Sequence, residues 1–472
     1  MKGDMGERAS GTTRRIATGA ASILFWILVW QAASMAVNSE FILAGPLDAA
    51  RSLVHLIPEP EFWGHIGFSL ARIALGTAAG YVLAIALAVA AHAWRAARIL
   101  IAPALSAIKS TPVACVVVVL LIWFGSRNVS AIAVFLMVLP GVYFPVLKGL
   151  DQLDPAREEL FWLYRARWGV RLLAHVVPGV LPYLVSASAT VLSMSWKAGV
   201  AAELIGVPDG SIGERIYQAK LLLETADLFA WTIVVVLIAW AFEHLVLAAL
   251  KACWPAAGRW AARRGEAAVT APSTADAREL VGAHNLAIGH TGTVICRGLD
   301  VSLHRGETLC LQGPSGAGKT TFIATISGTI PPLSGELNLL EHMRMSAIFQ
   351  DTRLIDDLNA CDNVRMFSGA ATPVRELLAE LLPTDALDVP VRELSGGQRR
   401  RVELVRALAA PSDLVLLDEP FTGLDEDTHR RAIAFIRAHA NGRAIVLSTH
   451  DPRDAEALGA HVLTVGRSRV GA

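Results

Sequence analysis

Gly313-Pro314-Ser315-Gly316-Ala317-Gly318-Lys319-Thr320 is the stretch of this sequence that decides the fold of its last third. It fits the pattern G-x-x-x-x-G-K-[ST], in which glycines leave backbone N–H groups free to surround phosphate oxygens and a lysine neutralises their charge. An apolar strand pattern from Glu307 to Gln312 precedes it, and a helical pattern from Thr320 to Ser327 follows it. Strand, turn and helix N-terminus are the setting that a phosphate loop requires, so the stretch predicts an α/β nucleotide-binding domain.

A second string, Leu394-Ser395-Gly396-Gly397-Gln398, opens a predicted helix from Gln398 to Leu408. Its serine and the backbone amides of its two glycines would form an anion site at that helix N-terminus. Beyond it, an apolar strand from Asp413 to Leu417 ends in the acidic pair Asp418-Glu419. Such a pair is common by chance, and its spacing from the two glycine-rich strings is what makes it specific.

These strings, in this order, resemble the ATP-binding-cassette ATPases. The resemblance implies ATP and Mg²⁺ as cofactors, with Lys319 on the β- and γ-phosphates. It implies Thr320, Gln350 and Asp418 around the metal, and Glu419, His450 and Gln350 as the catalytic set, with Glu419 as the general base for the attacking water. The nucleotide contacts that it implies are Gly313, Pro314, Ser315, Gly316, Ala317, Gly318, Lys319, Thr320, Thr321, Ser395, Gly396, Gly397, Gln398 and the dimer-contact residue Asp425.

The same resemblance implies a dimer. In this family the string Leu394 to Gln398 contacts the γ-phosphate of ATP that the opposite subunit holds, and this sequence carries one cassette. We therefore expect a homodimer with two-fold symmetry and two bound ATP molecules, and pairing with a second homologous chain stays open. The aromatic residue that stacks on adenine in the family has no clear counterpart here; His290 is a candidate replacement.

The composition places the rest of the chain in a membrane. Of 472 residues 53% are hydrophobic, which is too apolar for an ordinary soluble protein. The formal net charge is zero, so no global basic field indicates a nucleic-acid partner. Five scattered cysteines, without metal-ligand spacing, are expected to be small buried apolar residues rather than disulfides or a zinc site.

Six apolar stretches are long enough to cross a hydrocarbon core of roughly 30 Å. They run from Ile16 to Val37, Ile73 to Ala91, Ile99 to Phe124, Ser130 to Leu147, Gly179 to Val200, and Leu228 to Leu250. The first could instead be a cleaved signal peptide, but it is long for one and further spans follow. Gly76 and Gly80 in the second span have the spacing that lets two helices approach closely.

Basic residues set the expected orientation. Most of them fall on one side of the six-span count: Arg14, Arg15, Arg95, Arg98, Lys148, Arg157, Arg165, Arg167, Arg171, Lys251, Arg259, Arg263 and Arg264. By the positive-inside rule that side, both termini and the ATPase domain are expected to be cytoplasmic in a multi-pass inner-membrane protein.

The loop from Asp151 to Pro178 has the pattern of a short amphipathic helix, in which Leu160, Leu163, Tyr164, Arg167 and Arg171 share a face. It resembles the cytoplasmic loop of ATP-binding-cassette importer permeases, which docks on the ATPase. Aligning Pro178 places Glu159 at that loop's glutamate, whereas aligning Pro182 recovers Gly169 as its glycine. A plain amphipathic connector is the alternative.

The stretch Ser195 to Gly213 places Lys197 and Glu203 inside or at the edge of a span, where ionisable groups are functional candidates. The alternative is that Lys197 reaches the interface and Glu203 lies in water. The stretch is similar to permeases of the nitrate, sulfonate and taurine importer family. That resemblance implies a small anionic substrate and an extracytoplasmic substrate-binding protein as partner.

The expected organisation is therefore a membrane all-α permease over residues 1–250, a linker over 251–277 and an α/β P-loop ATPase over 278–472. The expected function is ATP-driven import of a small solute by a fused homodimer. An exporter of the same family, which can also fuse spans to a cassette, and a membrane ATPase with a signalling role remain the alternatives.

Overall fold

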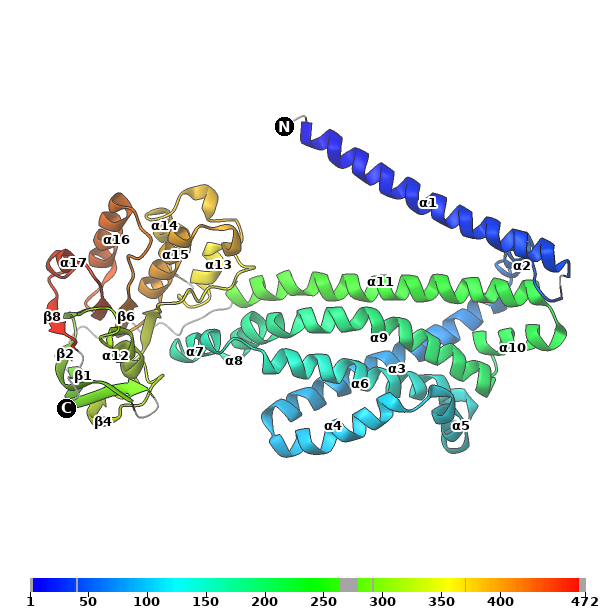
Figure 1. Cartoon of the computed structure of the whole chain (residues 1–472), viewed down its shortest axis with the longest axis horizontal. Helices are drawn as coiled ribbons and strands as arrows, with labels where there is room; N and C mark the ends of the chain where they lie inside the picture. The colour runs from blue at the N-terminus through cyan, green and yellow to red at the C-terminus, as the bar shows by residue number, and fades with distance from the viewer. Residues whose placement is uncertain (1–2, 40, 264–278, 291–292, 370, 467–472) are drawn as a thin grey trace. The chain divides into compact units, whose positions relative to one another are not determined.

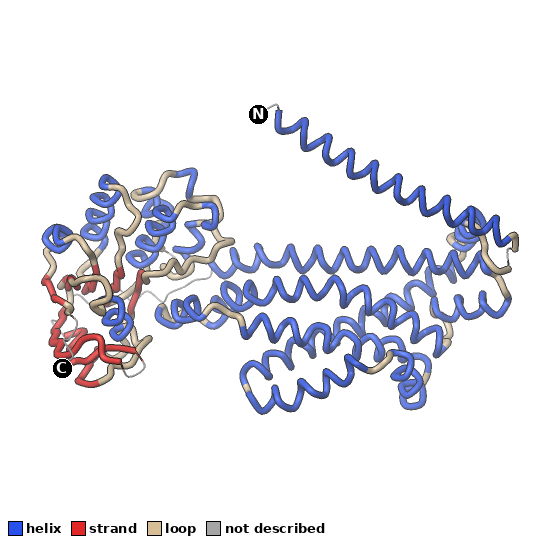
Figure 2. The backbone as a smooth tube through the Cα atoms, in the orientation of Figure 1, coloured by secondary structure: helices blue, strands red, loops and turns tan. Residues whose placement is uncertain are grey.

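The computed structural model describes residues 3–39, 41–263, 279–290, 293–369 and 371–466 (Figure 1). The chain divides into two compact units, Met1–Asp151 with Val180–Lys251, and Gln152–Gly179 with Ala252–Ala472. The described part of the first unit is helical, and the second contains the strands (Figure 2). This arrangement confirms the expected fold class of a helical permease followed by an α/β ATPase.

The described part of the first unit consists of helices, several of which are long and apolar. They are α1 (Gly3–Val37), α2 (Pro46–Leu56), α3 (Pro60–Ala93), α4 (Arg95–Ser110), α5 (Val113–Phe124), the short 3-10 helix η1 (Ser126–Asn128), α6 (Val129–Asp151), α9 (Val177–Gly206), α10 (Ile212–Leu222) and α11 (Thr225–Arg263). The last helix continues through Arg263, into the predicted linker, while residues 264–278 lie outside the described part of the chain.

Four helical stretches of the described residues are long and apolar enough to cross a membrane. They are Pro60–Ala93, Ser126–Asp151, Trp168–Gly206 and Thr225–Ala252. The expected first span falls in α1, whose described apolar segment Ala21–Val37 is shorter. These stretches match four of the six expected spans.

The expected span from Ile99 to Phe124 is wrong as a single helix. It forms α4 and α5, which meet at an angle of 104°. Pro112 causes the break, because proline has no N–H to donate and forces the residue before it out of the helical region. Thr111 accordingly has ψ of 130°, an extended conformation. The two helices count as a fifth span only if the bent pair is taken as one.

One ion cluster gathers three helix ends. The carboxylate of Asp151, the last residue of α6, accepts a hydrogen bond from Arg98 near the start of α4 and lies 3.0 Å from Nδ1 of His92 near the end of α3. The end of α3, the start of α4 and the end of α6 therefore meet at one face of this unit (Figure 1). The broken α4–α5 pair thus leads from that face and α6 returns to it, as a single span would require.

The glycines at Gly76 and Gly80 have the packing role that their spacing predicts. A Cβ atom at Gly76 would clash with the carbonyl oxygen of Ala131, and one at Gly80 would lie 2.7 Å from Val138. Both contacts are made by α6, so these glycines allow the backbones of α3 and α6 to approach closely.

The strands of the second unit form two sheets. Their bounds are β1 (Glu279–His290), β2 (Thr293–His304), β3 (Thr308–Gln312), β4 (Ser334–Leu339), β5 (Met345–Ile348), β6 (Leu414–Asp418), β7 (Ala444–Ser448) and β8 (His461–Thr464). A three-stranded antiparallel sheet has the order β2-β1-β4, and a five-stranded parallel sheet has the order β5-β6-β7-β3-β8. Every residue of β6 and β7 is buried, as expected for parallel strands covered on both faces.

The helices of the second unit lie before its strands or between them in sequence. They are α7 (Pro155–Leu163), α8 (Trp168–Arg171), the π-helical turn η2 (Leu172–Val176), α12 (Lys319–Ile326), α13 (Ala360–Arg365), α14 (Val374–Ala379), η3 (Thr384–Ala386), η4 (Val391–Glu393), α15 (Gly396–Ala409), α16 (Glu426–His439) and α17 (Pro452–Ala457). Because β3, β6 and β7 are parallel and adjacent, their carboxyl ends meet at one edge. The segments that leave those ends carry the residues singled out in the sequence.

Candidate functional site

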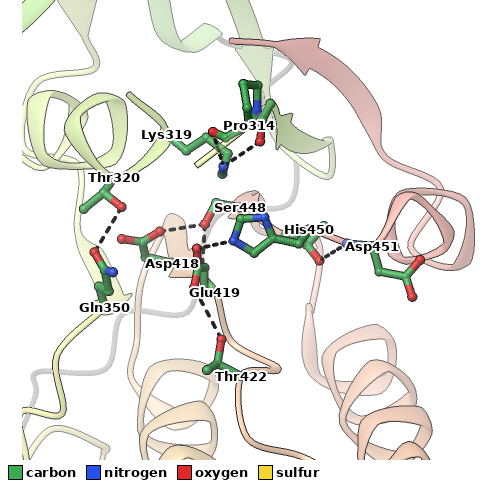
Figure 3. Close-up of polar contacts among 12 residues, drawn as sticks. Pro314, Lys319, Thr320, Gln350, Asp418, Glu419, Thr422, Ser448, His450 and Asp451 are labelled. Carbon is green, nitrogen blue, oxygen red and sulfur yellow. Dashed lines mark hydrogen bonds and ion pairs between the residues drawn. The ribbon is translucent and has the colours of Figure 1, made fainter. Parts of the chain in front are cut away.

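The phosphate loop connects β3 to α12, as the sequence predicts. Gly316 and Gly318 have φ of 75° and 107°, a region that glycine enters without steric cost. A Cβ atom at Gly313 would clash with the carbonyl oxygen of Val465. The Nζ atom of Lys319 donates hydrogen bonds to the carbonyl oxygens of Gly313 at 2.8 Å and Pro314 at 3.2 Å, which closes the loop around its own backbone (Figure 3).

The acidic pair lies at the end of β6, beside the phosphate loop (Figure 3). Asp418 is 1% exposed, and its carboxylate accepts a hydrogen bond of 2.6 Å from Ser448 Oγ at the end of β7. The same hydroxyl accepts a hydrogen bond of 3.0 Å from the N–H of Glu419. Burial raises the pKa of Asp418 above its ordinary value, against the opposing effect of the Ser448 hydrogen bond.

Glu419 and His450 form a close pair. Glu419 Oε1 lies 2.7 Å from Nε2 of His450, and its other oxygen accepts a hydrogen bond of 3.4 Å from Thr422 (Figure 3). The backbone of Glu419 is left-handed, with φ of 49°, which is uncommon for a residue with a side chain. This conformation turns its carboxylate out of the buried strand toward the edge where the phosphate loop lies.

Three oxygen donors fit a hard divalent cation. Thr320 Oγ1 lies 3.5 Å from Oε1 of Gln350, and Asp418 occupies the facing strand end (Figure 3). Hydroxyl, amide and carboxylate oxygens are the ligand types that Mg²⁺ accepts, usually together with substrate phosphates and water. The donor set therefore fits the metal expected from the sequence.

The string Ser395 to Gln398 caps α15. Ser395 Oγ accepts a hydrogen bond from the N–H of Gln398 at 3.3 Å, and the Gln398 side chain accepts one from the N–H of Ser395 at 2.9 Å. This reciprocal capping box orients the N–H groups at the start of α15, including those of Gly396 and Gly397.

Asp425 caps α16 by accepting hydrogen bonds of 2.9 Å from the N–H and from the hydroxyl of Thr428. These bonds lower the pKa of Asp425, so its carboxylate is ionised at neutral pH. His290, the candidate for the adenine contact, has Nε2 3.5 Å from the hydroxyl of Thr321 in α12. Residues 291 and 292 beyond it lie outside the described part of the chain.

The loop from Gln152 to Gly179 belongs to the same compact unit as the ATPase residues. Glu159 on α7 accepts a hydrogen bond of 2.7 Å from Arg353 and a second one from the hydroxyl of Thr329. Arg353 follows Gln350 in sequence, and Thr329 follows α12, so one carboxylate contacts both segments. These contacts confirm the expected docking role of the loop and favour Glu159 as the glutamate; Gly169 has open space around it.

The predicted single amphipathic helix is wrong in one respect. Arg165 has φ of 48°, which ends α7 and separates it from α8. Leu160, Phe161 and Leu163 are nevertheless buried in the hydrophobic core of the ATPase unit. The hydroxyl of Tyr164 donates to the carbonyl of Ala347 in β5 and accepts from its N–H, both at 3.2 Å. Burial raises the pKa of the Tyr164 phenol.

The two ionisable residues of α9 have different environments. Lys197 is exposed, whereas Glu203 is fully buried. Glu203 Oε2 accepts hydrogen bonds from Ser69 Oγ at 2.7 Å and from the N–H of Gly213 at 3.3 Å. The alternative of a water-exposed Glu203 is therefore wrong: its carboxylate ties α9 to α3 and to the start of α10.

Of the expected buried cysteines, Cys296, Cys310 and Cys361 are buried, while Cys115 on α5 is exposed, which corrects that expectation. Burial raises the pKa of Cys310 to about 11, so this thiol stays protonated. The side chain of Cys253 lies outside the described residues.

The sequence reasoning missed Arg353 and Thr329, because neither lies in a motif. Their positions in the sequence could have indicated them. Arg353 follows the segment that carries Gln350, and Thr329 follows the helix after the phosphate loop.

Two family models match the chain. Residues 67–255 match the model of the binding-protein-dependent transport system inner membrane component, and residues 296–422 match the ABC transporter model. The first covers most of the long apolar helices, and the second covers the phosphate loop, the string Ser395 to Gln398 and the acidic pair.

Curated relatives match the ATPase part. Thiamine import ATP-binding protein ThiQ of Vibrio vulnificus is 32% identical over 37% of this chain and 82% of its own length. Lipoprotein-releasing system ATP-binding protein LolD 1 of Caulobacter vibrioides is 30% identical over 34% of this chain and 81% of its own length. Nod factor export ATP-binding protein I of Cupriavidus pinatubonensis is 35% identical over 35% of this chain, which spans 57% of that relative.

Among solved structures, a dimeric ATP-binding cassette bound to ADP and Pi has 24% identity and a TM-score of 0.36, covering 40% of this chain and 94% of the cassette. The family models and the relatives agree with the motifs and the helices described above. The chain belongs to the ABC transporter family, in which it combines an importer-type permease and an ATP-hydrolysing cassette on one polypeptide.

Proposed function

We propose that this chain is a half-transporter that uses ATP hydrolysis to import a small solute across the cytoplasmic membrane. The observation that carries the proposal is the position of Glu159. It lies on a loop between two apolar helices of the permease, and its carboxylate is held by Arg353 and Thr329 of the ATPase. A movement of the segments around the nucleotide site would therefore act directly on the loop that leads into the permease.

The chemistry follows from the site. The backbone N–H groups that Gly313 to Thr320 offer, Pro314 excepted, would surround the phosphates, and Lys319 would exchange its two carbonyl partners for phosphate oxygens. Glu419 accepts hydrogen bonding from the attacking water and polarises it, while His450 holds the carboxylate and reaches the γ-phosphate. Thr320, Gln350 and Asp418 would hold Mg²⁺, which would supply neutralisation of charge on the phosphates.

The assembly that we propose is a homodimer. Each nucleotide would lie between the phosphate loop of one chain and the string Ser395 to Gln398 of its partner, with Asp425 near the contact. The termini and the ATPase would face the cytoplasm, and a substrate-binding protein would deliver the solute from the other side. The finer substrate class, a small anion such as nitrate, a sulfonate or taurine, rests on the resemblance of the stretch Ser195 to Gly213.

Proteoliposomes test this proposal directly. The purified chain, reconstituted with ATP on the cassette side, should accumulate labelled taurine, methanesulfonate or nitrate on that side when a binding protein encoded beside its gene is present. Glu419→Gln serves as the inactive control. Export is the competing function, since two matched relatives are named for export or release. Movement of a solute away from the ATP side, without a binding protein, would establish export and overturn import.

A further inference from the structure

Arg400, on the helix that follows the string Ser395 to Gln398, binds three backbone carbonyls at once. Its guanidinium donates to the carbonyl oxygen of Phe349 at 2.6 Å, to that of Glu419 at 2.9 Å, and to that of Asp418. The side chain is buried, with 5% of the residue exposed. The planar guanidinium, with five donors in a fixed fork, suits acceptors that lie on two different segments.

Two of these carbonyls flank the catalytic carboxylate. Glu419 has the left-handed φ of 49°, a conformation that persists only when the surrounding structure imposes it. The hydrogen bonds from Arg400 to the carbonyls of Asp418 and Glu419 hold the backbone on both sides of this turn. The third carbonyl, that of Phe349, immediately precedes Gln350. One guanidinium thus fixes the backbone of the general base and of the metal-contacting glutamine together.

Glu403, one turn further along α15, holds Arg400 in place. It is fully buried, and its carboxylate lies 3.2 Å from Arg400 Nη1. Its other oxygen accepts a hydrogen bond of 2.7 Å from the N–H of Arg353 and lies 3.5 Å from Arg406. Because Arg353 also binds Glu159 through its side chain, a continuous chain of polar contacts leads from the loop of the permease to Glu419.

The geometry points to Arg400 as a positioning residue for hydrolysis, which holds Glu419 in its left-handed turn and, through Glu403 and Arg353, joins that turn to Glu159. This inference rests on the proposed role of Glu419 as general base. It goes beyond that role because it assigns a function to a buried side chain whose hydrogen bonds run to backbone carbonyls and to Glu403. Its consequence is that displacement of the loop changes the rate of the chemical step rather than the affinity for ATP.

Arg400→Gln in the full chain, in detergent or nanodiscs, tests the inference. The expected result is a fall in kcat of about 10- to 100-fold, with KM for ATP changed by less than about threefold. Arg400→Lys keeps the charge but not the fork, so its kcat should lie between those of Arg400→Gln and the wild type. Glu403→Gln combined with Arg400→Gln should cost less than the product of the two single effects, because both act on the same turn.

Arg443→Gln is the matched control. Arg443 is also 5% exposed and donates to four carbonyls, those of Ala440, Ala410, Leu408 and His439. It precedes β7, at the end opposite Ser448. It should lower the unfolding midpoint without changing kcat. An Arg400→Gln protein with wild-type kcat, or with loss confined to KM, would overturn the inference. If Arg400→Gln does not fold, kcat and KM of Arg400→Lys are compared with those of the wild type instead, and a wild-type kcat would again overturn the inference. Normal hydrolysis by Glu419→Gln would instead remove the proposed general-base role of Glu419, on which this inference rests, so the two failures are distinguishable.

Discussion

Nε2 of His450 lies 2.7 Å from Oε1 of Glu419, so the side chains that follow the ends of β7 and β6 contact each other. His450 leaves a buried strand and is itself exposed, whereas Glu419 is turned outward by its left-handed backbone. The proposed role of Glu419 as the general base for the attacking water leads to the first prediction.

Glu419→Gln should bind ATP normally and hydrolyse it about 10²- to 10⁴-fold more slowly, because the amide keeps the contact with His450 but cannot take a proton from water. Phosphate release and binding of a fluorescent ATP analogue measure the two quantities. Glu380→Gln is the control, since that carboxylate pairs with His439 at 3.1 Å, outside the nucleotide site. Hydrolysis near the wild-type rate would remove the general-base assignment.

Two inactive chains should restore one site when they are mixed. Lys319→Ala should abolish nucleotide retention in its own phosphate loop, and Gly396→Asp places a negative charge where the partner's γ-phosphate is expected. A Cβ atom at Gly396 meets open space, so this variant should fold. With Glu419→Gln in both chains to prevent turnover, a mixed dimer contains one intact pair of half-sites.

The measurement is nucleotide occluded per dimer after purification through two different affinity tags. We expect about one ATP per mixed dimer and none in either parent dimer. Retention by the Gly396→Asp parent alone would mean that the phosphate loop and the string Ser395 to Gln398 do not share a nucleotide between chains.

The contact of Glu159 with Arg353 should hold α7 against the ATPase. Glu159→Gln leaves the Arg353 charge without its partner, at a site where the two side chains are 20% and 12% exposed. We expect a loss of about 1–2 kcal/mol, which corresponds to roughly 5- to 30-fold faster hydrogen exchange in Pro155–Leu163 of the full chain.

Glu158→Gln is the adjacent control, because Glu158 pairs with Arg171 of the loop itself. Glu158→Gln should leave the rate of hydrogen exchange in α7 unchanged. Equal effects of the two substitutions would argue that the charge pair with Arg353 contributes nothing specific. The double variant of Glu159→Gln with Arg353→Gln should be less impaired than the sum of its parts.

The raised pKa of Tyr164 leads us to expect that the free energy of unfolding depends on pH. Its buried phenol keeps its proton to a higher pH than the unfolded chain does, since unfolded tyrosine titrates near about 10. The folded state therefore binds more protons in the window above pH 10, and the free energy of unfolding falls as the pH rises through it. Below that window the contribution of Tyr164 is complete.

Tyr164→Phe removes the two hydrogen bonds to Ala347 but keeps the ring against Phe367, whose centroid is 4.7 Å away. Its urea midpoint should be lower than that of the wild type at pH 8, and the difference should shrink toward pH 10.5. A difference that stays constant across this range would show that the phenol does not titrate with unfolding.

The ATPase could be predicted from its sequence because its chemistry depends on backbone geometry that only a few residues permit. Gly316 and Gly318 adopt the positive φ values that identify the loop, and the apolar run before Asp418 became the buried strand β6. Hydrophobic periodicity reports such local features well.

The wrong or incomplete predictions have a common physical origin. Hydrophobicity along the sequence does not report how a helix changes direction or which segments pack against it. The stretch from Ile99 to Phe124 is apolar throughout, yet Pro112 turns it by 104°. Glu203 was ambiguous because only the packing of α3 and α10 decides whether its carboxylate meets water or Ser69. Arg400 belongs to a run of three arginines, a pattern typical of a solvent-exposed helix face. The carbonyls that it binds come from segments distant in sequence, so the sequence does not indicate its burial.

The division of the chain into units also has a practical consequence for handling the protein. The polypeptide passes between the two units at residues 151–152, 179–180 and 251–252, so the loop that carries Leu160 and Phe161 is removed when the cassette is expressed from residue 279 onward. The isolated cassette would then present to solvent the apolar surface that these side chains fill. If that fragment is poorly soluble and a peptide of residues 152–179 restores its solubility, the removal of the loop, rather than the cassette itself, causes the insolubility.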